Sequence, residues 1–227
     1  GMITFGVDVG DLLELQGALE GDGMHGAASE EEGVLVLHHG FGDLRDGGVL
    51  TEHGLDELRE AGDLGGQGKA TLDKLFVFYS HNESAWPRRS MRMTYTSNHD
   101  ANAWEGTDVE KFGDAVPAAT VLSYTGEGMP LIYNGQEAGN PKRLAFFEKD
   151  PIVWRAHPMA ELYTRLAALK KANPALANSD WGGRMIKVPN TAPDRLLSFV
   201  REKGGNKVFT VINFSPETLQ VRFEESL

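Results

Sequence analysis

The amino-acid sequence predicts an α/β fold: a partial (β/α)8 TIM barrel, made of its last β/α units, followed by a small antiparallel β-sandwich domain. Two extended segments each end abruptly in a polar cluster and are each followed by a helical pattern, which is typical of barrel strands that deliver side chains to their C-terminal face. The tail then holds short strand candidates at close spacing. We divide the chain into residues 1–70, of uncertain structure, a barrel portion at 71–177 and a β domain at 178–227.

The first 70 residues differ in composition from the rest of the 227-residue chain. They carry 15 acidic and 3 basic side chains, 17 of the 27 glycines and only 2 of the 20 aromatic residues. So few aromatic side chains provide little material for a packed core. In this acidic, Gly-rich segment we expect a short strand within residues 3–13 that runs into a helix, a second strand at 34–37 and a short helix at 55–61.

Composition also excludes several partners. The net charge of -11 argues against nucleic acid as a partner, and no run of about 18 apolar residues is available to span a membrane. The absence of cysteine excludes disulfides and thiolate metal sites. A glycine-rich pattern at 21–26 lacks the flanking strand and helix of a dinucleotide-binding loop, so no cofactor is evident.

The first barrel unit begins with an extended segment at residues 91–96. This segment stops at the polar tetrapeptide Ser97-Asn98-His99-Asp100, where a barrel strand would present its functional groups. We expect Asp108 to cap a helix at 109–124, in which Pro117 is a break or a kink.

A second unit follows the same plan. Residues 131–134 form a short apolar strand candidate that ends in the polar cluster 135–139, and residues 159–171 repeat apolar side chains at helical spacing. Before both units, residues 72–80 are apolar enough for a buried strand or a helix end. In the tail, Gly204-Gly205 predicts a hairpin loop among four strand candidates, at residues 184–188, 195–201, 207–214 and 218–223.

Two motifs in these units resemble those of a known family, the α-amylase family of glycoside hydrolases. The first motif is Tyr95-Thr96-Ser97-Asn98-His99-Asp100, and the second is Pro130-Leu131-Ile132-Tyr133-Asn134-Gly135-Gln136-Glu137. Their order, their spacing of about one barrel unit and the β-rich tail all agree with the C-terminal portion of that family. The resemblance extends from about residue 72 to the end of the chain.

The resemblance implies a retaining, carboxylate-based hydrolase that acts on α-1,4-glucans, with an α-glucan or maltooligosaccharide as its partner. Asp100 would stabilise the transition state by hydrogen bonds to sugar hydroxyls, which strengthen as positive charge develops. His99 would bind a hydroxyl of the same sugar, and Asn98, the third substrate-site candidate, would chiefly anchor the loop. The alternative is an ordinary capped loop, in which Asp100 or Asn98 satisfies backbone N–H groups.

Four more side chains belong to this interpretation. We expect Gln136 and Glu137 to make buried hydrogen bonds that support the site rather than take part in catalysis. Trp104 and Trp86 are candidates for stacking on a sugar face, and core positions for these two rings are an equal alternative.

The two carboxylates that a retaining glycosidase needs about 5–5.5 Å apart are not evident. Asp8, in Phe5-Gly6-Val7-Asp8-Val9, is a nucleophile candidate, but Gly6 stands where the family has an Arg. A surface Asp at a strand end is the alternative reading of Asp8, and the glutamates at 30–32 are typical of a solvated run. We therefore expect a truncated, divergent or spliced chain without full activity of its own.

The resemblance has further implications. Calcium is a cofactor in the family, but no calcium ligands are identified and no metal site is predicted. An extracellular or periplasmic location is implied, although no signal peptide is visible. Exposed edges of an incomplete barrel would favour self-association. The alternative functions are a non-catalytic glucan-binding or interaction fragment that retains the Asn-His-Asp loop, and an artificial joining of unrelated sequences.

Overall fold

The computed structural model describes most of the chain from residue 89 onward and short stretches before it. The described residues are 3–4, 33–39, 72, 75–77, 79, 86–87, 89–215 and 217–223. Asp8, the glutamates at 30–32, the helix expected at 55–61 and most of the strand expected at 3–13 lie outside them.

The helical part of the described residues consists of helical positions at 75–77 and 79, three complete α-helices and five short helical turns. The α-helices are α4 (Asp108–Phe112), α5 (Val116–Thr125) and α6 (Pro158–Ala172). The turns are the π-helical η1 (Ala101–Glu105) and the 3-10 turns η2 (Gly113–Ala115), η3 (Gln136–Ala138), η4 (Pro174–Leu176) and η5 (Ser179–Trp181). None of the described helices is long and apolar enough to cross a membrane.

The strands form three sheets. A four-stranded sheet has the order β2 (Gly33–His39), β7 (Asn206–Asn213), β6 (Leu196–Lys203) and β5 (Ile186–Lys187). Two pairs complete the set: β1 (Ile3–Thr4) with β8 (Gln220–Val221), and β3 (Met93–Thr94) with β4 (Met129–Pro130).

The strands β3 and β4 are parallel, with Met93 opposite Met129. They are joined through the turns and helices from η1 to α5, so they form the strand–helix–strand unit that the sequence predicts. The position of β4 differs from the prediction, because its strand covers residues 129–130 and not 131–134. The backbone N–H of Tyr133 donates instead to the side chain of Gln136, so the chain has left the ladder there.

The single helix expected at 109–124 is two helices. Gly113, with φ of 54°, separates α4 from the 3-10 turn that precedes α5. Pro117 lies in the first turn of α5, where its missing N–H costs nothing, so it helps to start a helix rather than to kink one. The cap of α4 is Thr107 and not Asp108.

The tail is confirmed as a set of short strands, but its main sheet is mixed. β6 and β7 form the expected hairpin, in which Gly204 and Gly205 have φ of 59° and 84°, the positive values that a tight hairpin turn needs. β5 pairs antiparallel with β6, whereas β2 pairs parallel with β7. The strand expected at 34–37 is therefore present within β2, and it makes the sheet partly parallel instead of purely antiparallel.

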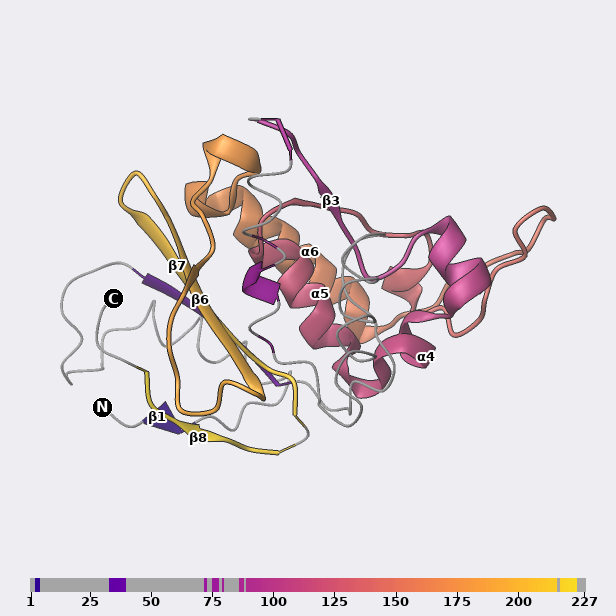
Figure 1. The fold of residues 1–227 in the computed structure, drawn as a ribbon. Coiled ribbons are helices and arrows are strands. Elements are labelled where there is room, and N and C mark those ends of the chain that lie inside the picture. Colours follow the sequence, from indigo (N-terminus) through magenta and orange to yellow (C-terminus); the bar gives the residue numbers. More distant parts are fainter. Residues whose placement is uncertain are drawn as a thin grey trace.

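One hydrophobic core joins the helices to this sheet. Figure 1 shows α5 and α6 side by side, with the β6–β7 hairpin on one side of them and α4 on the other. The expected helix at 159–171 is confirmed as α6, and its periodic apolar residues are buried except Leu169, which is partly buried. Core side chains come from α5 (Leu122), α6 (Leu162, Leu166), β6 (Phe199) and β7 (Ile212).

Candidate functional site

The Asn-His-Asp loop begins where β3 ends. Thr96 and Ser97 are buried, and they bring the chain from the strand pair to the surface. The side-chain oxygen of Asn98 accepts a hydrogen bond of 2.7 Å from the backbone N–H of Ala101. Asn98 therefore holds the start of η1, as expected of a loop anchor. Its assignment to sugar binding stays a prediction.

His99 and Asp100 project from this anchored turn into solvent. The Nε2 atom of His99 lies 3.3 Å from Oδ2 of Asp100, and the two side chains are 68% and 51% exposed. Asp100 occupies the cap position of η1 but makes no capping hydrogen bond with its side chain. Of the two residues that could have capped the loop, Asn98 does so and Asp100 does not. The carboxylate of Asp100 therefore faces outward, beside the imidazole of His99.

A buried polar network supports the loop from below. The amide nitrogen of Gln136 donates to Oγ1 of Thr96 at 2.7 Å and to Oδ2 of Asp108 at 2.6 Å. The ammonium of Lys111 donates to the carbonyl of Thr96 at 2.8 Å. These bonds connect the chain after β4, the chain after β3 and helix α4. The buried hydrogen bonds expected of Gln136 are present, whereas Glu137 is only half-buried and its carboxylate accepts from the N–H of Gly135 in its own turn.

Sequence reasoning missed two members of this network, Asp108 and Lys111. Burial raises the pKa of the Asp108 carboxyl, while the hydrogen bond from Gln136 opposes the shift. Burial lowers the pKa of Lys111, and the nearby Asp108 charge opposes that shift. Burial removes water from the charged forms of Asp108 and Lys111. These two side chains therefore depend on the hydrogen bonds and charges within the network for their stabilisation. The residues around Asp108 carry no local signal for this role, because its partner Gln136 lies 28 positions further along the chain.

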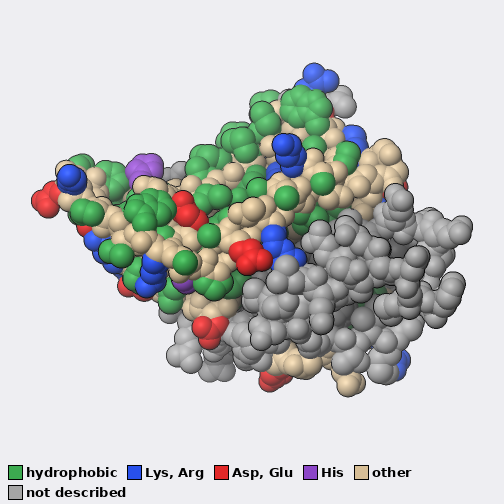
Figure 2. Space-filling view, turned by 180° about the vertical axis from the view of Figure 1, so that it is seen from behind, with side chains coloured by type: hydrophobic (Ala, Val, Ile, Leu, Met, Phe, Trp, Pro, Cys, Tyr) green, Lys and Arg blue, Asp and Glu red, His purple; other side chains and the backbone are tan. Residues whose placement is uncertain are grey.

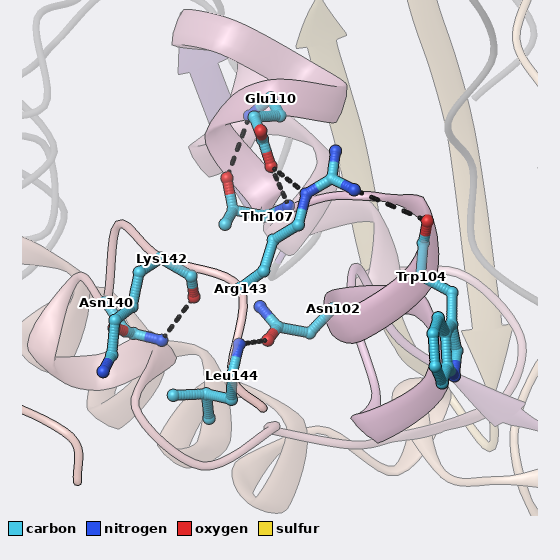
Figure 3. A network of polar contacts seen from close by, with 8 residues as sticks. All are labelled: Asn102, Trp104, Thr107, Glu110, Asn140, Lys142, Arg143 and Leu144. Carbon is cyan, nitrogen blue, oxygen red and sulfur yellow. Dashed lines mark hydrogen bonds and ion pairs between the residues drawn. The ribbon is translucent and has the colours of Figure 1, made fainter. Parts of the chain in front are cut away.

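The segment after β4 is tied to η1 and α4 by a second, exposed network, drawn in Figure 3. The backbone N–H of Leu144 donates to Oδ1 of Asn102 at 2.7 Å. Arg143 donates from Nε to Glu110 at 2.9 Å and from Nη1 to the carbonyl of Trp104 at 3.5 Å. The bond from Arg143 and a backbone bond from Thr107 lower the pKa of Glu110 to about 2. These contacts fix the loop that carries Phe146 beside His99.

The two tryptophans named as sugar-stacking candidates are both exposed, so the core alternative is wrong for them. Trp104 lies in η1, and its ring centroid is 5.5 Å from that of Phe146. Trp86 instead lines a cavity of about 690 Å³ with Arg92, Glu127 and Arg184. Because Arg92 and Glu127 precede β3 and β4, this cavity lies at the opposite ends of the strands from His99 and Asp100.

Within the described part of the chain, no three His, Asp or Glu side chains gather in a way that could hold a metal ion. The nucleophile candidate Asp8 is outside the described residues.

The fold and the site together define an α/β protein that carries an exposed His–Asp pair at the carboxyl end of a parallel strand pair. No family model matches the chain. Two curated proteins match part of the chain. Alpha-amylase MalA of Haloarcula japonica is 27% identical over 161 residues, which are 69% of this chain and 22% of the relative. Alpha-amylase 2 of Dictyoglomus thermophilum is 24% identical over 162 residues, 64% of this chain and 27% of the relative.

Solved structures give a similar result. The noncanonic maltogenic alpha-amylase AmyB from Thermotoga neapolitana matches with a TM-score of 0.59 and 23% identity, over 70% of this chain and 37% of that one. The alpha-amylase from Geobacillus thermoleovorans, solved with acarbose, matches with a TM-score of 0.50 and 18% identity, over 64% and 32%. At these identities the structural matches show a shared fold.

The comparisons confirm the resemblance to the α-amylase family over about two thirds of the chain. The chain spans about a quarter of the length of the curated relatives that it matches, 22% and 27%. At the level of family, the relatives support a glycoside hydrolase.

Proposed function

We propose that this chain contributes one part of an α-amylase-like, retaining glycoside hydrolase active site, in which the Asn-His-Asp loop holds one glucose unit of an α-1,4-glucan. The observation that carries the proposal is the His99–Asp100 pair, exposed at the carboxyl end of β3 and not used for capping. A carboxylate in that state is free to accept hydrogen bonds from sugar hydroxyls.

Asp100 is proposed to stabilise the transition state rather than to attack the substrate. Hydrogen bonds from the sugar hydroxyls to its carboxylate become stronger as the ring approaches an oxocarbenium ion, and they supply several kcal/mol. His99 would bind a neighbouring hydroxyl, and its ring is held by Asp100 and by Phe146. Asn98 is proposed to act through the loop that it anchors.

Hydrolysis requires two further carboxylates, a nucleophile and a general acid. Asp8 remains the proposed nucleophile, and no general acid is assigned. We therefore propose that this chain alone binds glucans and hydrolyses them poorly or not at all. The mechanism as a whole belongs to a longer assembly of barrel strands, of which β3 and β4 are two.

Calorimetric titration of the purified chain with maltohexaose tests the binding role. We expect Asp100→Asn, which keeps the shape and removes the charge, to weaken binding at least 10-fold, because hydrogen bonds to a charged group contribute about 1.5–3 kcal/mol. Asp114→Asn is the matched control, since Asp114 is exposed in η2 away from the loop. Equal affinity of Asp100→Asn and the unmodified chain would contradict the proposal.

A second candidate function is a glucan-binding fragment without chemistry. The glycine at position 6, where the family has an Arg before the nucleophile, favours it. A starch-hydrolysis assay on the same preparation tests for chemistry: turnover that is lost in Asp8→Asn would exclude the fragment, whereas binding that depends on Asp100 without any turnover is expected of both candidates.

Self-association is a further proposal about partners. Met93 and Met129 lie opposite each other on β3 and β4, and both are exposed. Apolar side chains on the face of a short parallel pair are usually covered. Sedimentation velocity over a range of protein concentrations tests the proposal, and a monomer at every concentration would contradict it.

A further inference from the structure

The cavity of about 690 Å³ lies at the ends of β3 and β4 that are opposite to the Asn-His-Asp loop. Its walls come from the chain before β3 (Trp86, Arg89), the chain before β4 (Glu127), the turn η5 with the residues after it (Arg184) and the end of β6 (Lys203). This volume is within the range of sites that take a small molecule. The proposed sugar site uses none of these residues, so the cavity has no role so far.

Hydrogen bonds connect the walls of the cavity to one another. The ammonium of Lys203 donates to the carbonyl of Asp180 at 2.7 Å, which joins β6 to η5. The N–H of Met185 donates to Oε1 of Glu127 at 2.5 Å, which joins the chain after η5 to the chain before β4. Segments far apart in the sequence are therefore fixed around the cavity by contacts within the protein.

Two residues of the cavity have a backbone conformation that residues other than glycine rarely adopt. Arg89 has φ of 69° and Ser179 has φ of 53°, and among the described residues no other non-glycine residue has a positive φ. Such a conformation costs free energy, and residues held in it cluster at active sites and ligand-binding sites. Both of these residues belong to one cavity although they are 90 positions apart, which points to the cavity as a binding site.

Two arginine–tryptophan pairs lie at the cavity. Cζ of Arg92 is 5.8 Å from the ring centroid of Trp86, and Cζ of Arg89 is 6.0 Å from that of Trp181 in η5. The two rings are 50% and 54% exposed, so part of each ring surface can contact a ligand. A guanidinium beside an aromatic face has N–H groups in its plane that suit the oxygens of a phosphate or a carboxylate.

The charges around the cavity favour an anion. Four basic side chains and three acidic ones line it: Arg89, Arg92, Arg184 and Lys203, and Glu127, Asp180 and Glu202. Two of the carboxylates have cations near them that do not line the cavity. The charge of Glu127 acts on Arg201, and Glu202 lies 3.8 Å from Lys207. These outer cations offset the two carboxylates, so the basic side chains dominate inside the cavity.

Figures 1 and 2 show where the cavity opens. In Figure 1 the chain before β3 and the turns that follow α6 approach each other at the upper end of the molecule. In Figure 2, seen from behind, this upper end carries hydrophobic side chains next to Lys or Arg side chains. The surface thus combines apolar and cationic groups at the end of the molecule where the cavity lies.

A ligand that matches these walls has a planar ring for the tryptophan faces and a phosphate for the guanidinium groups. We propose that the cavity binds a small organic phosphate with a planar ring, of the class of a nucleoside monophosphate. Arg89 holds the phosphate and Trp86 stacks on the base. The net charge of -11 disfavours a long polyanion, whereas a mononucleotide contacts only the local cationic walls. The inference is independent of the proposed function.

Calorimetric titration of the full chain with adenosine monophosphate, adenosine and inorganic phosphate at low ionic strength tests the inference. We expect adenosine monophosphate to bind at least 10-fold more tightly than either adenosine or phosphate, because only the nucleotide uses the rings and the cations together. Arg89→Met should weaken the binding of the nucleotide and of phosphate about 10-fold or more, the scale of one hydrogen bond to a charged group.

Trp86→Ala should weaken the binding of the nucleotide roughly 3- to 10-fold, the range for an aromatic stacking contact, and should leave phosphate binding unchanged. Trp86→Phe, which keeps a ring, should restore most of the affinity. Arg89 and Trp86 are both exposed, so these variants keep the hydrophobic core, and an unchanged melting temperature by circular dichroism checks this.

The matched controls are Arg222→Met and Trp154→Ala. Both residues are exposed and neither lines the cavity, so both variants should bind adenosine monophosphate as the unmodified chain does. Arg89→Met should leave the binding of maltohexaose unchanged, which separates this cavity from the proposed sugar site.

Three outcomes would overturn the inference and leave the proposed function standing. The first is that adenosine monophosphate does not bind. The second is that it binds equally to the unmodified chain, Arg89→Met and Trp86→Ala, which would place the nucleotide elsewhere. The third is that inorganic phosphate binds as tightly as the nucleotide, since the rings would then contribute nothing to recognition.

Discussion

Glu110 and Arg143 show how a single exposed ion pair can organise a loop. The carboxylate of Glu110 accepts bonds from the guanidinium of Arg143 at 2.9 Å and from the N–H of Thr107 at 2.7 Å. Exposed ion pairs contribute little to global stability, so the consequence of this pair is local. It fixes the approach of the segment that places Phe146 beside His99.

The titration of Glu110 follows from these contacts. Its pKa is lowered from the ordinary 4.5 to about 2 by Arg143 first and the Thr107 N–H second. Because folding lowers the pKa of Glu110, its stabilising contribution is complete above the pKa of the unfolded chain and is lost as the pH falls toward 2. We expect Arg143→Met to raise the Glu110 pKa toward 4.5 in a carbon-detected NMR titration.

The control for that titration is Arg195→Met, which removes an exposed ion pair with Glu217 near the end of the chain. It should leave the Glu110 pKa where it is. A Glu110 pKa that does not move in Arg143→Met would mean that the backbone bond from Thr107, and not the ion pair, holds the carboxylate in its charged form.

At the scale of the elements, Gln136 connects β3 to β4. Its side chain bonds Thr96 and Asp108 and accepts from the N–H of Tyr133 at 2.7 Å. A residue after one strand thus fixes the chain after the neighbouring strand. The His99–Asp100 pair is presented by this arrangement, because Thr96 lies only three residues before His99.

Gln136→Met should lower the free energy of unfolding by about 2 kcal/mol at pH 7, since the half-buried carboxylate of Asp108 loses a hydrogen bond. Burial raises the pKa of Asp108, so the folded chain binds that proton more tightly than the unfolded chain. The contribution of Asp108 is therefore most favourable below its unfolded value and declines as the pH rises through its raised folded pKa. Without Gln136 to stabilise the carboxylate, the destabilisation should be larger at pH 7 than at pH 3.

Urea denaturation at the two pH values measures this difference. Gln220→Met is the matched control, because Gln220 is exposed in β8, and it should be nearly neutral at both. An equal loss of stability at pH 3 and pH 7 in Gln136→Met would contradict the role assigned to the Gln136–Asp108 bond.

At the scale of the whole molecule, Arg201 links the four-stranded sheet to the helical layer. It lies in β6, its side chain is buried, and it donates to the carbonyls of Gly126 at 2.7 Å and Thr125 at 3.2 Å at the end of α5. It also bonds the carbonyls of Gly183 and Ala177, each at 2.8 Å. The free carbonyls at the end of a helix are thus satisfied by a cation from another layer, which also suits the helix dipole.

We expect Arg201→Met to lower the free energy of unfolding by about 3 kcal/mol or more, because several buried carbonyls lose their donor at once. Since the helices and the sheet share one core, the unmodified protein should unfold in a single transition by circular dichroism. Arg222→Met, at an exposed position near the end of the chain, should change little. Two separate transitions in the unmodified chain would contradict a shared core.

The sequence alone predicted the elements whose signals are local. The apolar period in residues 159–171 gave α6, with Met159, Leu162, Tyr163 and Leu166 buried as the period requires. The Gly204-Gly205 pair predicted the β6–β7 hairpin, because only a residue that tolerates positive φ suits that turn. The Asn-His-Asp motif predicted the polar loop after β3 and contributed to the resemblance to α-amylases that the comparisons support over about two thirds of the chain.

Other features depend on residues far apart in the chain. The parallel pairing of β2 with β7 could not be read from local pattern, because it follows from competition among several feasible partners. The cap at Thr107 does have a local signal, the Thr-x-x-Glu spacing to Glu110, which the prediction of Asp108 as the cap overlooked. The contact between His99 and Phe146 joins positions 47 residues apart, and the bond from Arg201 to Thr125 joins positions 76 apart. No periodicity encodes such distances.

By itself, then, the sequence determined which segments become helices, hairpins and polar loops, because backbone preference and apolar spacing act over a few residues. Only the tertiary structure decided that Asp100 faces solvent while Asn98 caps the turn, and that an aromatic surface adjoins His99. The physical reason is that burial, desolvation and ring contacts depend on which elements pack together, and that is settled when the helices and the sheet close their common core.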